Sequence, residues 1–467
     1  MKINRVAKDF INYFISDLFV KGFLFISLPL LSWVLSPEDY GILSLITSAI
    51  SILFVFFSFN IQNAVYNKYL HSSDDFGSYL FSNLLTLFPI QILTIGLFPF
   101  YHSFLSKWFG LNEFDLFLVV VVCFLMTYFN IYCSYLQASR QSRRYAVINI
   151  TSKLTEVILM FLIAYCLLSD KYLSKVYASI IVFSISMVII LPSIFYIVKF
   201  KFEIKFVKDA FKFSIPLIPH VLATSLLAHA DRIIINDLLG SHATGIYSFS
   251  YNLGMAVIVV VMAWNSSWQP RFFELIKSGS NLDILKVTRF SCVVIFCVGS
   301  LLVLFSQEFV VILSNSSYYE GIPIIPLITI SNALVHIYLI YANFTYYRKK
   351  TAFISLATLF ALFINVLLNY LFIPLWGLKG AAWATILSYV FLCIFHFFVC
   401  RYFMRFYIVN FSVIPLFFFS ICSVYILMSF LNHWLDGLYF FLSKVLLYVL
   451  VVGFSYKVVR YYNLGFR

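Results

Sequence analysis

Long apolar segments recur along the whole chain, and they constrain its fold more than any other feature of the sequence. A helix needs about 20 largely apolar residues to cross a lipid bilayer. Hydrophobic residues make up 62% of the 467 residues and charged residues 11%, whereas a soluble domain carries about 25% charged residues. There are therefore too few charges to cover the surface of a soluble enzyme, and the chain is too apolar for a disordered scaffold or a nucleic-acid-binding protein. We predict an all-α integral membrane protein.

Polar residues, glycines and prolines divide the chain into about fourteen candidate transmembrane helices. They are residues 13–35, 41–62, 79–101, 114–138, 145–168, 174–198, 213–239, 244–266, 289–313, 322–345, 351–374, 379–400, 409–431 and 438–458. The amino-terminal segment MKINRVAKDF is basic, but no small-residue cleavage site follows the first apolar run. We therefore expect this run to be retained as the first span.

The cations are distributed unevenly between alternate connections. Of the 32 Lys and Arg residues, 24 fall on the side that holds both termini, four fall on the opposite side (Lys107, Lys171, Lys175 and Lys379), and four fall within spans. Connections rich in Lys and Arg stay in the cytoplasm, so both termini are predicted to be cytoplasmic. The net charge of +13 then reports the topology and requires no nucleic acid partner.

An internal repeat indicates two bundles. LSPEDYGILSL (35–45) aligns without gaps with LGSHATGIYSF (239–249), and this offset of 204 residues superposes the first span on the seventh in the same orientation. We predict a six-helix bundle in residues 1–198, a cytoplasmic amphipathic linker in 199–212, a second six-helix bundle in 213–400, and two additional helices in 401–467. Parallel repeats that move against each other around a central site are typical of transporters.

Several segments resemble one known family. PLLSWVLSPEDYGILSL (29–45), FKFSIPLIPH (211–220), ADRIIINDLLGSHATGIYSFSYNLG (230–254) and PLWGLKGAAWATILS (374–388) are similar to the polysaccharide (O-antigen) flippases, often called Wzx-type. That family belongs to the MATE-like multidrug/oligosaccharidyl-lipid/polysaccharide exporter superfamily. The resemblance implies a V-shaped pair of bundles that moves undecaprenyl-pyrophosphate-linked oligosaccharide from the cytoplasmic to the outer leaflet by alternating access.

The same resemblance implies a location and partners. It places the protein in the bacterial plasma (inner) membrane, as a monomer, with the lipid-linked oligosaccharide as its substrate and other polysaccharide-assembly proteins as further candidate partners. One feature departs from the related lipid II flippases, in which arginines of the second span contribute to the cytoplasmic side of the lumen. Here residues 41–62 contain no Lys or Arg, which argues against lipid II as the substrate.

Ionisable residues inside the spans are the candidates for function, because a charge at the bilayer centre costs at least about 2.5 kcal/mol. They include Asp17 and Lys21 in the first span, Lys153 and Glu156 in the fifth, His220, His229, Asp231 and Arg232 in the seventh, and His336 in the tenth. Asp17 and Lys21 share one helix face, as do Lys153 and Glu156, so each pair could instead only neutralise itself and hold helices together. Asp231 and Arg232 point about 100° apart, so we expect each to need a partner elsewhere.

The depth of these residues suggests their roles. Lys21 and Lys153, in the cytoplasmic third of their spans, are predicted to attract the substrate pyrophosphate, and Arg232, in the periplasmic third, to receive it with its bidentate guanidinium. The residues predicted to balance charge or couple ions are Asp231, Asp17, Glu156, His220 and His336. Coupling to a proton gradient, to a sodium gradient or to neither stays open, and each histidine could equally be a packing residue. Pro216 and Pro219 mark a candidate kink or hinge just before the charges of the seventh span.

We expect no catalytic residue, metal site or cofactor. The eight cysteines lie in apolar stretches without the spacing of metal ligands and read as small buried hydrophobes. The phosphate-binding motif GxxxxGK[ST] is absent from the sequence, so no ATP hydrolysis by this chain is expected.

Two other functions stay open. A MATE-type drug or cation antiporter would share the fold but favours an acidic lumen without cations, whereas Lys21, Lys153 and Arg232 point the other way. A membrane glycosyltransferase or polymerase would place acidic residues in an outside loop, and Glu38 and Asp39 occupy that position. The loop is short, however, and the two acids are also typical of the start of a helix.

Overall fold

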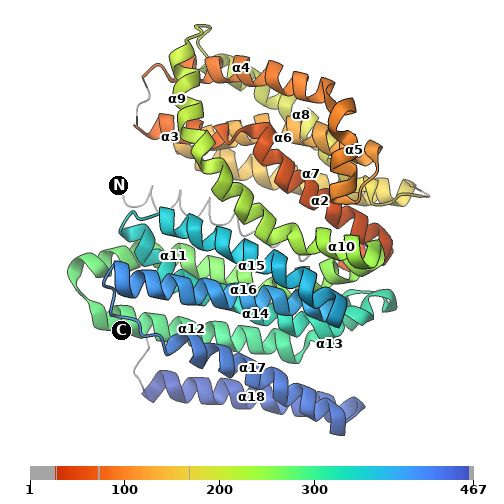
Figure 1. Ribbon diagram of the computed structural model, residues 1–467, viewed down its shortest axis with the longest axis vertical. Helices are drawn as coiled ribbons and strands as arrows, with labels where there is room; N and C mark the ends of the chain where they lie inside the picture. Colours follow the sequence, from red (N-terminus) through yellow and green to blue (C-terminus); the bar gives the residue numbers. More distant parts are fainter. Residues whose placement is uncertain (1–26, 28, 72–73, 168, 462–467) are drawn as a thin grey trace. The chain divides into compact units, whose positions relative to one another are not determined.

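The computed structural model describes residues 27, 29–71, 74–167 and 169–461. This part of the chain is helical and contains no β-strand (Figure 1). Most of the predicted first span, including Asp17 and Lys21, lies outside the described residues.

Twelve stretches of the described residues are long and apolar enough to cross a membrane. The helices that form them are α2 (Pro37–Ser58), α4 (Phe76–Gly96), α6 (Glu113–Ala138), α7 (Ser142–Cys166), α8 (Leu173–Ile197), α10 (Ile218–Gly254), α11 (Ala256–Ser278), α12 (Asn281–Leu304), α14 (Ile325–Tyr347), α15 (Ala352–Trp376), α16 (Leu378–Phe398), α17 (Val413–Trp434) and α18 (Gly437–Tyr461). One stretch, residues 204–278, contains both the seventh and the eighth predicted spans. An all-α membrane protein of about fourteen helices is therefore confirmed.

Short helices complete the fold. They are α3 (Ile61–His71), α5 (Phe98–Phe109), α9 (Ile204–Ser214) and α13 (Ser306–Leu313), with 3-10 turns at Ile215–Leu217 and Ser316–Ile324 and a π-helical turn at Val399–Phe403. The predicted third span, residues 79–101, ends early because the chain breaks at Leu97 and restarts as α5, with Pro99 in its first turn. Proline fits the first turn of a helix, where no intrahelical partner is needed for its missing N–H.

The eighth span differs most from its predicted bounds of 244–266. Helical structure runs from residue 241 to 278, interrupted only near Met255. Beyond the apolar stretch, Arg271 Nη1 donates to Glu274 Oε2 at 2.8 Å, a pair three residues apart that supports an exposed helix. The helix ends where Gly279 adopts a left-handed φ of 71°, so hydropathy located the span but not the end of the helix.

The described residues pack into two compact units, one ending at Gly245 and one beginning at Ile246. Residues 213–245 pack with the first unit, whereas the repeat assigns them to the second bundle. The compact units are defined by contacts and the bundles by a sequence repeat, so the predicted division into two six-helix bundles stays a prediction. Within α10, Gly240 has φ 85° and ψ 176°, a conformation open mainly to glycine. This residue separates a first segment (218–239) from a second segment (241–254).

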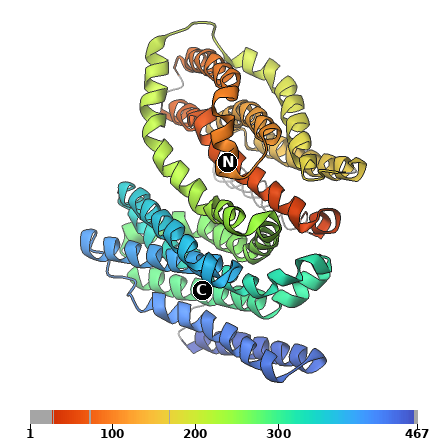
Figure 2. The same cartoon turned by 45° about the vertical axis from the view of Figure 1, so that its right-hand side comes forward.

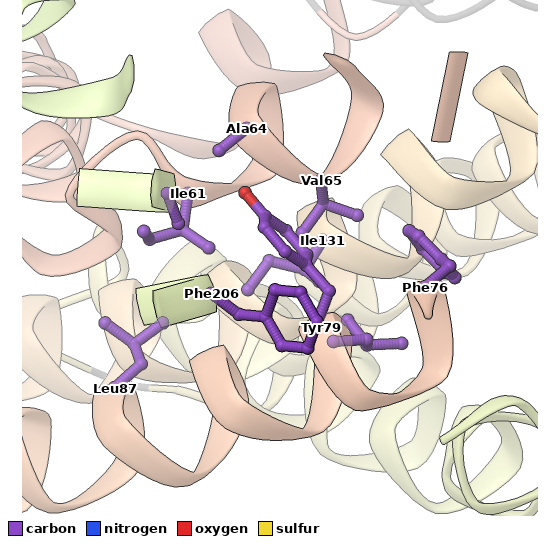
Figure 3. Packing of buried hydrophobic residues seen from close by; sticks show 10 residues of the cluster. Ile61, Ala64, Val65, Phe76, Tyr79, Leu87, Ile131 and Phe206 are labelled. Atoms are coloured by element: carbon purple, nitrogen blue, oxygen red, sulfur yellow. The ribbon is translucent and has the colours of Figure 1, made fainter. Parts of the chain in front are cut away.

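The predicted linker, residues 199–212, contains most of α9, which continues two residues further to Ser214. Phe206 and Ala210 of α9 are buried against α3, α4 and α6 together with Tyr79 and Ile131 (Figure 3). The rings of Phe206 and Tyr79 meet edge to face with centroids 5.8 Å apart. The linker is thus part of the core of the first unit.

Polar contacts hold the start of the linker. The Glu203 N–H donates to Ser82 Oγ at 3.0 Å on α4. Hydrogen bonds from the ammonium groups of Lys201 and Lys205 hold the pKa of Glu203 below its ordinary value. After α9, Pro216 lies in the 3-10 turn that precedes α10, so the prolines mark the start of a helix, and a hinge role for them stays a prediction.

The two glycines aligned by the repeat lie against each other. A Cβ built on Gly41 of α2 would lie 2.0 Å from the carbonyl oxygen of Ser241, and one built on Gly245 would lie 1.8 Å from that of Pro37. Such contacts are too short for any side chain, so α2 and the second segment of α10 cross with their backbones touching. The residues that meet all lie in the first unit, which ends at Gly245, and the contact is reciprocal, since Pro37 and Ser241 are also 204 residues apart.

In the second unit, α14 is the central helix. In the stretch Ser316–Tyr347, 94% of the most apolar window is buried, and α14 contacts α11, α12, α16 and α17. Figure 2 shows the helices of the chain from a second direction. The two additional carboxy-terminal helices, α17 and α18, both pack on α12. Lys444 of α18 is fully buried and forms an ion pair with Glu308 of α13.

Candidate polar site in the first unit

A group of polar side chains lies between α2, α7 and α8, and we refer to it as the polar cluster. Its members are Thr47, Lys153, Glu156, Lys175 and Ser179. Glu156 is the centre: its Oε2 accepts from Lys153 Nζ at 2.7 Å and its Oε1 from Ser179 Oγ at 2.7 Å. Both carboxylate oxygens of Glu156 therefore have a partner.

The helix periodicity explains why these residues meet. Lys153 and Glu156 are three residues apart on α7, and Lys175 and Ser179 are four apart on α8, so each pair shares a face. Because α7 and α8 pack along each other, the two faces come together. Lys175 Nζ also donates to Thr47 Oγ1 of α2 at 3.2 Å.

The polar cluster contains two lysines and one glutamate. Lys175 is close enough to both Glu156 and Lys153 to interact with them electrostatically. The side chains of Lys153 and Glu156 are 29% and 13% exposed, and that of Lys175 is partly buried. With the lysines charged, the group carries one positive charge more than Glu156 can balance, in a region where charge is costly.

The first segment of α10 brings further polar residues to the same helix, α2. His229 Nδ1 lies 3.2 Å from Ser48 Oγ, and His229 is within electrostatic reach of both Arg232 and Lys175. Lys175 of α8 and His229 of α10 therefore lie against the adjacent hydroxyl groups of Thr47 and Ser48 on α2.

Asp231 and Arg232 form an ion pair with each other, contrary to the expectation that neither satisfies the other directly, whereas the need of each for a further partner stays a prediction. Arg232 Nη1 lies 3.6 Å from Asp231 Oδ1 and donates to the Ala228 carbonyl at 2.6 Å. The arginine side chain is long enough to fold back along its own helix, so the angle between neighbouring Cβ directions does not decide which groups meet. Both residues are buried, with 3% and 5% of their surface exposed.

The structure shows where two lysines lie along their helices. Lys153 lies near the middle of α7, which begins at Ser142, and its depth in the membrane stays a prediction. Lys175, assigned above to an outside connection, is the third residue of α8 and points at α2. Its spacing of four residues from Ser179 was the signal that could have indicated an inward-facing position.

Two further predicted site residues, His336 and His220, have other surroundings in the described part of the chain. His336 is buried in the second unit, where its Nε2 lies 2.9 Å from Ser291 Oγ, an arrangement that fits packing. His220 lies at the start of α10, and its Nδ1 is buried without a hydrogen-bond partner among the described residues. Asp17 and Lys21 fall outside the described part of the chain, so their roles stay predictions.

Two other expectations concern the rest of the site chemistry. Within the described residues, no group of three or more His, Cys, Asp or Glu side chains is placed to hold a metal ion. Glu38 and Asp39, the acids considered for an enzyme, lie in the first turn of α2, where the Asp39 N–H donates to Ser36 Oγ at 3.2 Å. That is the position in which acids stabilise a helix start.

Comparison with known sequences gives relatives over most of the chain. It is 24% identical over 372 residues to "Lsg locus putative protein 1" of Haemophilus influenzae, covering 78% of this chain and 90% of the relative. It is 23% identical over 414 residues to an uncharacterized membrane protein of Methanocaldococcus jannaschii, covering 82% of this chain and 95% of the relative. These relatives are membrane proteins by name or of putative function.

Solved structures share the fold. The lipid II flippase MurJ in its inward closed conformation superposes with a TM-score of 0.69 at 17% identity, covering 96% of this chain and 99% of that one. An inward-facing multidrug resistance MATE family transporter of the MOP superfamily gives 0.64 at 12% identity, covering 85% and 96%. Residues 6–276 match the family described as Polysaccharide biosynthesis protein. Since this match covers more than half of the chain, the protein belongs to that family, on a fold shared with MurJ and the MATE transporters.

Proposed function

We propose that this protein is a flippase that moves undecaprenyl-pyrophosphate-linked oligosaccharide, an O-antigen or similar repeat unit, from the cytoplasmic to the outer leaflet of the bacterial inner membrane. The observation that carries the proposal is the polar cluster. It places two lysines against one glutamate inside the spans of a polysaccharide biosynthesis family member. The diphosphate is the anionic part of such a substrate. Because an unpaired charge inside the membrane is costly, cations within the spans would stabilise this anion during its passage.

The transport cycle that we propose is alternating access. Alternating access would expose the polar cluster and Arg232 first to the cytoplasmic and then to the outer side, with both termini in the cytoplasm and the protein acting as a monomer. Lys153 and Arg232 are each paired with an acid, Glu156 and Asp231. Substrate phosphate would replace these carboxylates as partner, so the acids would keep the cations paired while the site is empty. Coupling of this exchange to protons or sodium stays open.

The excess of lysine in the polar cluster also bears on the alternatives. A cation antiporter of the MATE type would need an anionic site, which this cluster does not supply. A glycosyltransferase or polymerase would need acids dedicated to catalysis, whereas Glu38 and Asp39 lie in the first turn of α2, where acids stabilise the start of a helix. The flippase is the function that fits the site best.

A gene deletion tests the proposal. We expect loss of surface polysaccharide on a gel, accumulation of the lipid-linked precursor in the inner leaflet, and recovery of both on complementation. Unchanged surface polysaccharide in the deletion strain would contradict the flippase function.

Arg232→Ala is expected to reduce export at least tenfold at normal protein level, because it removes a charge-assisted, bidentate phosphate ligand. Arg232→Lys should retain part of the activity, since it keeps the charge but loses the planar fork. Arg271→Ala, which breaks an exposed ion pair with Glu274, is the matched control and should export normally. Full export by Arg232→Ala would exclude the assignment.

A further inference from the structure

Lys175 differs from the other cations near the polar cluster in its partners. Arg232 and Lys153 each lie in an ion pair, with Asp231 and with Glu156. Among the described residues, the hydrogen bond of Lys175 goes to a neutral hydroxyl, that of Thr47. The Thr47 hydroxyl donates its own hydrogen to the Leu43 carbonyl at 2.8 Å. The Thr47 oxygen therefore acts as the acceptor toward Lys175.

A single hydroxyl cannot satisfy a partly buried ammonium. The ammonium of lysine has three donor hydrogens and no acceptor, and a charge inside a membrane protein normally faces a counter-charge or a water-filled space. The nearby Glu156 already accepts from Lys153 and Ser179 with its two oxygens. The positive charge in excess within the cluster is therefore located on Lys175.

We propose that Lys175, supported by Thr47, is the position that binds a phosphate group of the substrate, and that Glu156 limits the affinity of this position for anions. The inference rests on the proposed flippase function and deepens it. A phosphate oxygen would accept hydrogen bonds from Lys175 that no carboxylate now accepts. Glu156, within electrostatic reach of Lys175, repels the incoming anion and thereby keeps binding weak enough for release.

The site is built from three helices of one unit. Thr47 comes from α2, Glu156 from α7 and Lys175 from α8, all before Gly245. Ser48, the residue after Thr47, lies with its Oγ 3.2 Å from Nδ1 of His229 on α10, and His229 is within electrostatic reach of Arg232, which is the candidate second cation for a diphosphate held at Lys175.

The test measures binding to the purified full-length protein in detergent. The probes are farnesyl pyrophosphate and inorganic pyrophosphate, with farnesol as the neutral control. Lys175→Met is expected to raise the Kd for farnesyl pyrophosphate about tenfold or more, as for the loss of one charge-assisted hydrogen bond. Lys175→Arg should stay within about threefold of the wild type, because it keeps the charge. The matched control is Lys171→Met, in the turn before α8, which should bind as the wild type does.

Glu156→Gln separates anion binding from a merely structural role. It removes the repelling charge, so we expect tighter binding of farnesyl pyrophosphate, a gain that a folding defect cannot produce. Wild-type affinity in Lys175→Met, weaker binding in Glu156→Gln, or no binding of either pyrophosphate by the wild type would each overturn the inference. If Lys175→Met both binds and exports normally while the deletion strain lacks surface polysaccharide, the inference fails and the flippase function stands. If the deletion strain keeps its polysaccharide, the proposed function fails.

Discussion

Replacing Gly245 with leucine is expected to destabilise the first unit strongly. The new Cβ would lie 1.8 Å from the carbonyl oxygen of Pro37, and that oxygen belongs to the backbone. Neither group can rotate away, so α2 and the second segment of α10 would have to separate. Overpacking costs about 1–3 kcal/mol where side chains can adjust, and we expect at least the upper end here.

The measurements for this variant are the yield of monodisperse protein in detergent and its unfolding temperature. Gly41→Leu should have a comparable effect, since a Cβ there meets the Ser241 carbonyl oxygen at 2.0 Å. The effects of the two should not add, because either one separates the same pair of helices. Gly453→Ala is the control: no atom lies within 4 Å of its Cβ position, and alanine favours helix. A wild-type unfolding temperature for Gly245→Leu would show that the helices are not in backbone contact.

Lys444→Met is expected to destabilise the second unit by about 3 kcal/mol, the cost of breaking a buried ion pair from one side. Lys444 is fully buried, its Nζ lies 4.3 Å from the ring centroid of Phe440, and its partner Glu308 is 26% exposed. The remaining Oε2 of Glu308 has no hydrogen-bond partner among the described residues. Loss of the ammonium would therefore leave a carboxylate poorly solvated within the protein.

A double variant identifies the cause. Lys444→Met combined with Glu308→Met should recover much of the lost stability, because replacing both charges by apolar groups removes the unpaired carboxylate. Lys201→Met, at an exposed ion pair with Glu203, should leave the unfolding temperature nearly unchanged. Equal destabilisation by the double and the single variant would mean that Lys444 acts through packing alone.

The transmembrane helices could be predicted because hydropathy acts on about 20 residues at once. What hydropathy does not report is where a helix stops outside the apolar stretch. The helix that continues to Ser278 is stabilised there by an exposed ion pair and ended by Gly279, neither of which changes the apolar count. The single-residue break at Gly240 was likewise hidden, because one residue with a positive φ replaced the loop expected between two spans.

The site was predicted less completely, and for a physical reason. Lys153 and Glu156 could be recognised as a pair because both lie on one helix and obey its periodicity. The sequence could not show that Lys175 lies close to this pair, since its position depends on how α7, α8 and α2 pack. For Asp231 and Arg232, the sequence indicated their burial, whereas the ion pair between them depends on the side-chain conformation of the arginine.

The crossing of α2 with the second segment of α10 has the symmetry of a homodimer interface within one chain. Pro37 and Gly41 meet Gly245 and Ser241 reciprocally, as residues do in an isologous contact. A duplicated gene that began as such a dimer would have carried each substitution at two places at once. Fusion of the copies would release them from this constraint, and one of the two helices here begins with proline and the other with serine. Gly41 and Gly245, at which the two backbones touch, are the positions at which neither half would be free to diverge.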